Sequence, residues 1–157
     1  FDDAMRFALL GGNIDITALP ADIQPKISLA SALDRLRSKN ISLDQVTVSS
    51  DANGSLPLFD QNKKLIGMKA ARIDSLTLEY QRLVVDGYLP AHEALRLFTC
   101  NPAARLSLTG EKGVIASSAC ADIAVFGDDW QVDTVLAKGE VYVQGGKLIK
   151  GGFFEKY

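Results

Sequence analysis

Residues 13–51 read NIDITALPADIQPKISLASALDRLRSKNISLDQVTVSSD. Residues 13–17 alternate polar and apolar side chains and include β-branched residues, which is typical of a strand. After a loop with two prolines, Ser28 is of a type favoured at helix N-caps, and an apolar face with helical spacing follows it. That face consists of Leu29, Ala32, Leu33 and Leu36. Residues 45–50 are β-prone again, so the order strand, helix, strand predicts an α/β fold with parallel strands.

A helix is also predicted before this segment, because apolar residues recur at helical spacing from Phe1 to Leu9. The Gly11-Gly12 pair supplies a left-handed stop that ends it. Since the helical spacing already starts at Phe1, we expect the chain to begin inside a helix. Two parallel strands with their helices leave faces and edges of the sheet uncovered. The α/β part is therefore expected to be incomplete unless further residues or a partner chain complete it.

The pattern changes along the rest of the chain. Residues 51–69 form a polar, glycine-containing stretch, and helical spacing returns over residues 73–86 and 91–99. Further along, short β-prone pieces are separated by glycine or Asp-Asp turns. They are residues 113–116, 121–126, 132–138 and 140–144. We therefore predict two domains, an α/β body over residues 1–111 and a small antiparallel β unit over residues 112–157.

Charge and hydropathy argue against two classes of partner. Seventeen Lys+Arg against nineteen Asp+Glu give a formal net charge of −2, and no basic cluster forms the stripe that a nucleic-acid-binding protein needs. No apolar run approaches the ~20 residues that cross a bilayer, and no cleavable signal is evident. Cys100 and Cys120 show neither metal-binding nor redox spacing, which fits a reducing compartment. We expect a cytoplasmic protein that binds neither nucleic acid nor membrane.

Asp51 is the first candidate for a catalytic residue. It follows the second predicted strand, and α/β barrels place catalytic groups just past the carboxyl ends of parallel strands. The alternative is structural, because an aspartate before Asn53-Gly54 is also typical of an Asx-turn. His92, the single histidine, has the ordinary features of an exposed helical residue. One histidine, two separated cysteines and one placed aspartate do not complete a zinc site.

Residues 11–17 read GGNIDIT and residues 46–60 read VTVSSDANGSLPLFD. Both segments resemble the isoaspartyl dipeptidase family of metal-dependent amidohydrolases. Residues 97–106, LFTCNPAARL, and 121–126, ADIAVF, are similar to a tail shared by many amidohydrolases. The resemblance implies the C-terminal portion of a (β/α)8 TIM-type barrel, over residues 1–111, followed by part of a small β-sandwich domain.

The resemblance also implies roles for two residues. Asp51 stands where the family has an aspartate beside a two-zinc centre, so it would be a metal ligand and would move a proton from the attacking water to the departing amine. Ser55 stands where the family binds the α-carboxylate of the substrate, for which a hydroxyl and turn amides are suitable donors. An ordinary turn residue is the alternative for Ser55. The family's other zinc ligands, four histidines and a carboxylated lysine or a glutamate, have no counterpart here, and we expect them upstream of Phe1.

The function implied by the resemblance is hydrolysis of the β-aspartyl bond in dipeptides by a full-length enzyme with two zinc ions. This chain alone would be inactive. Two alternatives stay open. One is another metal-dependent amidohydrolase, similar to dihydroorotases, hydantoinases or deacetylases, and the other is a non-catalytic piece that only completes a fold or an assembly. Members of the family associate, so a homo-oligomer is expected.

Overall fold

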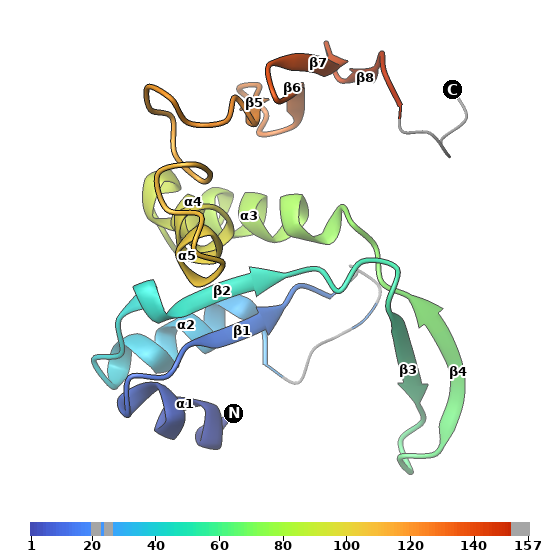
Figure 1. The fold of residues 1–157 in the computed structure, drawn as a ribbon. Coiled ribbons are helices and arrows are strands. Elements are labelled where there is room, and N and C mark those ends of the chain that lie inside the picture. The colour runs from blue at the N-terminus through green and yellow to red at the C-terminus, as the bar shows by residue number, and fades with distance from the viewer. Residues whose placement is uncertain (20–22, 24–26, 152–157) are drawn as a thin grey trace. The chain divides into compact units, whose positions relative to one another are not determined.

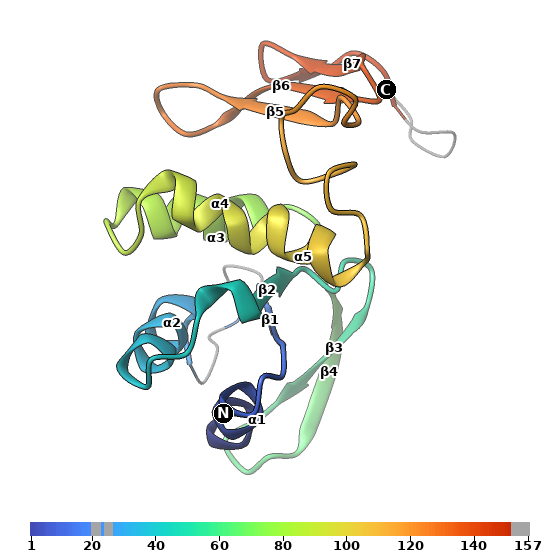
Figure 2. The ribbon, with the colours of Figure 1, turned by 60° about the vertical axis from the view of Figure 1, so that its left-hand side comes forward.

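The computed structural model describes residues 1–19, 23 and 27–151. The chain divides into two compact units, Phe1–Pro102 and Ala103–Tyr157 (Figures 1 and 2). The first unit contains α1 (Asp2–Leu9), β1 (Ile14–Thr17), α2 (Leu29–Ser38), the 3-10 helix η1 (Leu43–Gln45), β2 (Val46–Ser49), β3 (Ser55–Phe59), β4 (Leu65–Ala70), α3 (Ser75–Val85) and α4 (Ala91–Phe98). The short helix α5 (Cys100–Arg105) spans the boundary, and the second unit contains β5 (Ile123–Phe126), β6 (Val132–Ala137), β7 (Glu140–Gln144) and β8 (Lys147–Leu148). Over the described ranges, no helix has both the length and the apolar character that crossing a membrane requires.

Strands β1 and β2 pair in parallel, which confirms the predicted strand, helix, strand order. The register runs from Ile14 opposite Val46 to Thr17 opposite Ser49. Successive side chains of a strand point to opposite faces of a sheet, so Ile14 and Val46 share one face. Both are buried. The predicted loop around Pro20 and Pro25 lies outside the described residues.

Helix α2 begins where the sequence predicts it. The Ser28 hydroxyl accepts from the Ser31 amide at 3.2 Å, which satisfies one of the unpaired donors of the first turn. The whole apolar face is buried, and Leu36 is fully inaccessible. Helix α1 likewise ends at the glycine pair, with Gly11 at φ +88°. On α1, Met5 and Ala8 are buried, so both helices contribute side chains to the core of the first unit.

Helices α3 and α4 contact each other, and α4 also contacts β2. The rings of Tyr80 and Phe98 meet edge to face at a centroid distance of 6.0 Å. Just after α4, the buried Asn101 side chain donates to the carbonyl oxygens of Leu43 and Val46 at 2.8 and 2.7 Å. These two bonds satisfy one carbonyl group of η1 and one at the start of β2, so Asn101 ties the beginning of the second parallel strand to the residues before it.

The stretch over residues 51–69, for which the sequence predicts no regular element, contains an antiparallel hairpin of β3 and β4. Pro57 and Gly67 lie within its strands, and both residue types weaken a strand pattern. At the turn, the Asp60 carboxylate accepts from the amides of Asn62 and Lys64 at 2.8 and 2.9 Å. The hairpin thus starts directly after the loop that carries Asp51.

The second unit contains one antiparallel sheet in the order β5-β6-β7-β8. Three of the four predicted β-prone pieces correspond to β5, β6 and β7. The strand predicted over residues 113–116 is wrong, because these residues form no strand and Ile115 is 88% exposed. A strand is defined by hydrogen bonds to a neighbouring strand, so β-prone residues that gain no such partner do not form one. The domain assignment to residues 1–111 and 112–157 stays a prediction.

Candidate functional site

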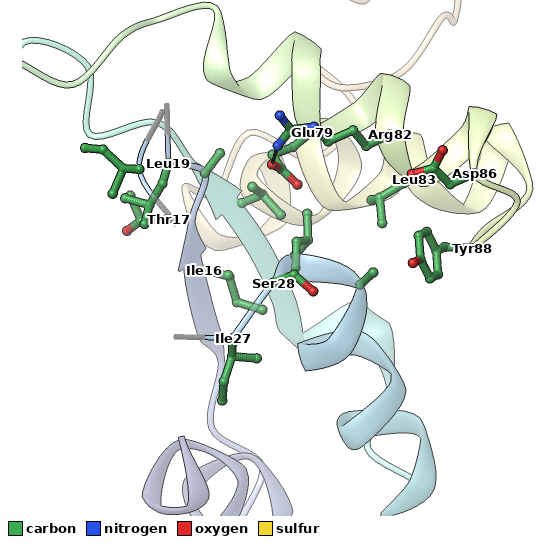
Figure 3. Close-up of a pocket in the computed structure, with 15 residues that line it drawn as sticks. Ile16, Thr17, Leu19, Ile27, Ser28, Glu79, Arg82, Leu83, Asp86 and Tyr88 are labelled. Carbon is green, nitrogen blue, oxygen red and sulfur yellow. Dashed lines mark hydrogen bonds and ion pairs between the residues drawn. The ribbon is translucent and has the colours of Figure 1, made fainter. Parts of the chain in front are cut away.

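The carboxyl ends of β1 and β2 carry polar side chains on one common face. Asp15 lies opposite Thr47 in the register, and Thr17 lies opposite Ser49. The other face carries apolar side chains, and Figure 3 shows Ile16 pointing towards α2 while Thr17 projects from the opposite side of β1. The alternation of a strand therefore separates an apolar face against helices from a polar face at which the chain can place chemistry.

Asp15 is held by two hydroxyl groups of the neighbouring strand. Thr47 donates to Oδ1 at 2.6 Å and Ser49 donates to Oδ2 at 2.5 Å. Both distances are in the range of hydrogen bonds to an ionised carboxylate. Asp15 is exposed, but its two carboxylate oxygens already accept hydrogen bonds from β2. We therefore assign it a structural role in pairing the two strands.

Asp51 follows β2 by two residues and adopts φ +48°, in the left-handed region. Its side chain is exposed, and its two carboxylate oxygens face different strands. Oδ2 lies 3.3 Å from the Thr17 hydroxyl, and Oδ1 lies 3.5 Å from the Ser49 hydroxyl. The structure thus places Asp51 beside the last register pair of the parallel ladder.

Backbone groups close the turn after Asp51. The Gly54 amide donates to the Asp51 carbonyl at 2.8 Å, and the Asn53 amide donates to the carbonyl of Ala71 at 3.0 Å. In the described part of the chain, the side-chain groups within hydrogen-bonding distance of the Asp51 carboxylate are the hydroxyls of Thr17 and Ser49. An Asx-turn is therefore not what occupies this carboxylate, and its exposed side stays accessible.

Ser55 begins β3 and is exposed. The amides of Asn53 and Gly54, which the sequence suggested as further donors, are already used by backbone carbonyls. Within the part of the chain that the structure describes, no hydrogen bond occupies the Ser55 hydroxyl. The hydroxyl is therefore the donor that this turn can offer to an anionic group.

Two hollows lie in the first unit, and Thr17 is among the residues that line the first of them. A cavity of about 200 Å³ is lined by Ile16 and Val48 together with residues of α2 and α3, and within it Arg82 pairs with Glu79 (Figure 3). His92 is exposed on α4, as the sequence predicts, and lines the second hollow with the ion pair of Arg37 and Glu93. In both hollows, oppositely charged side chains pair with each other.

Comparison with known proteins gives a family for this chain. The model of the amidohydrolase family matches residues 19–142. The chain belongs to the amidohydrolase family. This membership confirms the coarser part of the sequence resemblance, and the mixed α/β structure agrees with it.

Solved structures of amidohydrolases are similar to this chain. Beta-aspartyl dipeptidase from the thermophilic, keratin-degrading Fervidobacterium islandicum AW-1, solved in complex with the β-Asp-Leu dipeptide, is 30% identical with a TM-score of 0.80 over 97% of this chain. Another structure of beta-aspartyl dipeptidase from that organism is 26% identical with a TM-score of 0.74 over 98% of this chain. The chain spans 38% and 37% of the lengths of these two proteins.

N-acetylglucosamine-6-phosphate deacetylase from Pasteurella multocida shares the fold at 17% identity, with a TM-score of 0.59 over 84% of this chain and 37% of its own. Amidohydrolases generally bind metal ions, often zinc. The exposed Asp51 carboxylate suits one such ligand, since carboxylate oxygens coordinate zinc. Across the described residues, no group of three or more His, Cys, Asp or Glu side chains is placed to hold a metal ion. The residues present therefore fit one ligand of a metal centre and not a complete centre.

The sequence did not predict that Thr17 lies beside Asp51. The two residues lie 34 positions apart, and only the parallel register brings the Thr17 hydroxyl to the carboxylate. The available signal was the alternation over residues 13–17, which places Asp15 and Thr17 on the same polar face.

Proposed function

We propose that the complete protein hydrolyses the β-aspartyl bond of dipeptides, releasing aspartate and a second amino acid. The observation that carries this proposal is the position of Asp51, whose exposed carboxylate lies past the carboxyl end of a parallel strand in an amidohydrolase. Similarity to beta-aspartyl dipeptidase along 97% of this chain supports the substrate class. The proposal includes the last strands of a TIM-type barrel for the first unit and a part of a β-sandwich for the second.

In the proposed reaction, water adds to the scissile carbonyl carbon while the Asp51 carboxylate takes one of its protons. Asp51 then delivers that proton to the departing amine nitrogen as the carbon–nitrogen bond breaks. Zinc, when bound, polarises the carbonyl oxygen and acidifies the water. Asp51 would supply one oxygen ligand for the metal, and a complete centre would need further ligands.

Ser55 binds the α-carboxylate of the substrate in this proposal. Its hydroxyl is exposed one residue beyond the turn that starts at Asp51, so the anchor and the proton carrier are tied to one short segment. A hydroxyl that donates to a carboxylate makes a charge-assisted hydrogen bond. Such a bond orients a dipeptide by the group that all β-aspartyl dipeptides share.

The test uses the product of the complete reading frame, loaded with zinc, and compares β-aspartyl-leucine with α-aspartyl-leucine. Selective cleavage of the β-linked peptide is expected. Cleavage of a cyclic amide or an acylated amino acid instead would replace the proposal with another amidohydrolase activity. A folded protein that binds no metal and cleaves none of these would favour the non-catalytic alternative. Light scattering of the same sample checks the expected self-association.

Two substitutions assign the proposed roles. Asp51→Asn removes the proton acceptor, so kcat is expected to fall by about 10²–10⁴-fold. Ser55→Ala removes one charge-assisted donor and is expected to raise KM by about tenfold or more with little change in kcat. The matched controls are Asp3→Asn, at an exposed carboxylate of α1, and Ser117→Ala, at an exposed hydroxyl of the second unit. Wild-type turnover in Asp51→Asn would contradict its role.

A further inference from the structure

The Asp51 carboxylate lies between two hydroxyl groups that come from different strands. Thr17 and Ser49 are register partners at the carboxyl ends of β1 and β2, which lie side by side in Figure 1. Thr17 faces Oδ2 at 3.3 Å and Ser49 faces Oδ1 at 3.5 Å. The orientation of the carboxylate therefore depends on which of these two hydroxyls donates to it.

Ser49 has only one hydroxyl hydrogen, and Asp15 competes for it. The Ser49 oxygen is 2.5 Å from Oδ2 of Asp15 and 3.5 Å from Oδ1 of Asp51. A hydroxyl carries a single hydrogen and donates along the shorter, charge-assisted contact. The Ser49 hydrogen is therefore committed to Asp15, which leaves Thr17 as the donor to Asp51 within the described part of the chain.

The backbone of Thr17 is held by its pairing with β2. Its backbone lies in the parallel ladder, and the next amide, that of Ala18, donates to the Ser49 carbonyl at 2.7 Å. A β-branched side chain on a strand has few χ1 rotamers. Asp51, in contrast, lies in a loop at φ +48°. A rigid strand hydroxyl thus meets a loop carboxylate, and the strand is the partner that fixes the orientation.

We propose that Thr17 is a positioning residue for Asp51. Its hydroxyl donates to Oδ2 and so fixes the orientation of the whole carboxylate, whose remaining lone pairs stay available for a metal ion and for the proton. This inference rests on the proposed function, in which Asp51 carries the proton. Accurate placement of a catalytic group matters because a misplacement of about 1 Å can cost roughly 10²-fold in rate.

The test compares three variants of the zinc-loaded product of the complete reading frame. Thr17→Val removes the hydroxyl but keeps the β-branched shape, and Thr17→Ser keeps the hydroxyl. Thr47→Val is the matched control, because Thr47 is on the same polar face but its hydroxyl contacts Asp15 rather than Asp51. With β-aspartyl-leucine, we expect Thr17→Val to lower kcat by about 10–100-fold with KM changed by less than about twofold. For Thr17→Ser and Thr47→Val, kcat is expected to stay within about threefold of the wild-type value.

Two further measurements separate positioning from general damage. Zinc content and the midpoint of thermal unfolding are expected to be unchanged in Thr17→Val. Crystal structures of wild type and Thr17→Val are expected to differ in the side-chain torsions of Asp51. Wild-type kcat in Thr17→Val, or equal losses in Thr17→Val and Thr47→Val, would overturn the inference. If wild type does not cleave β-aspartyl-leucine, the proposed function fails, and the Asp51 torsions in the two crystal structures still decide whether Thr17 positions it.

Discussion

Gly54 and Asp51 close the turn after β2, with the Gly54 amide donating to the Asp51 carbonyl oxygen at 2.8 Å. The approach leaves no space for a side chain, because a Cβ on Gly54 would lie 2.7 Å from this oxygen. Ser55 follows directly as the first residue of β3. The close turn therefore sets how far the proposed carboxylate anchor lies from the proposed proton carrier.

Substituting Gly54 by alanine is expected to shift this turn and to lower both stability and activity. The added methyl meets a backbone oxygen, which cannot rotate away as a flexible side chain does. Overpacking of this kind costs about 1–3 kcal/mol. The matched control is Gly67→Ala in β4, where the nearest atom to an added Cβ is a Leu58 methyl at 3.9 Å. Urea unfolding and hydrolysis of β-aspartyl-leucine measure the effect, and equal behaviour of the two variants would contradict it.

Asn101→Ala is expected to destabilise the first unit. The buried amide donates to two carbonyl groups, of Leu43 and Val46, and the substitution leaves both without this donor. A buried polar group that loses its partner costs about 1–3 kcal/mol. Asn62→Ala serves as control, since the Asn62 side chain is exposed at the hairpin turn. The free energy of unfolding from urea titration is the measurement, and an unchanged value for Asn101→Ala would show that these bonds contribute nothing net.

The turn of the β3–β4 hairpin is expected to depend on the Asp60 carboxylate. Asp60→Ala removes the acceptor for the amides of Asn62 and Lys64, whereas Asp60→Asn keeps a carbonyl oxygen that can accept them. We expect faster amide hydrogen exchange over residues 55–70 in Asp60→Ala, corresponding to about 1–2 kcal/mol less protection. Asp60→Asn is expected to exchange much like wild type. Equal protection in all three proteins would contradict this assignment.

The stability of the second unit is expected to depend on pH through Asp122. The hydrogen bond from the Lys112 ammonium lowers the pKa of Asp122 below its ordinary value of 3.8, with a smaller contribution from the Lys138 amide. Because the folded pKa is below the unfolded one, the contribution is present above pH 3.8 and is lost as the pH falls through the folded value.

Thermal unfolding of Asp122→Asn and wild type tests this dependence. The variant is expected to have the lower midpoint at about pH 7, and the difference is expected to shrink as the pH falls below 3.8 and wild-type Asp122 becomes protonated. Asp128→Asn removes an exposed carboxylate of the same unit and is expected to show no such trend. A difference for Asp122→Asn that stays constant over this range would rule out the proposed linkage.

Local sequence patterns predicted several of the helices and strands. The alternation over residues 13–17 and the apolar face after Ser28 predicted β1 and α2, because periodicity of 2 or 3.6 residues follows from backbone geometry alone. The β3–β4 hairpin was missed, since Pro57 and Gly67 interrupt the strand pattern and the pairing of the two strands compensates for both. Residues 113–116 show the opposite error, because they are β-prone but pair with no strand in the described part of the chain.

The sequence by itself determined the parallel strand, helix, strand order, the position of Asp51 just after β2 and the likeness to amidohydrolases, because these depend on neighbouring residues or on motif spacing. Only the tertiary structure decided that Thr17 faces Asp51 and that the Ser49 hydroxyl lies closer to Asp15 than to Asp51. These contacts join residues 34 positions apart, so they depend on the register of β1 against β2. Periodicity assigns a side chain to a face, but only the pairing of the strands decides which side chain it meets there.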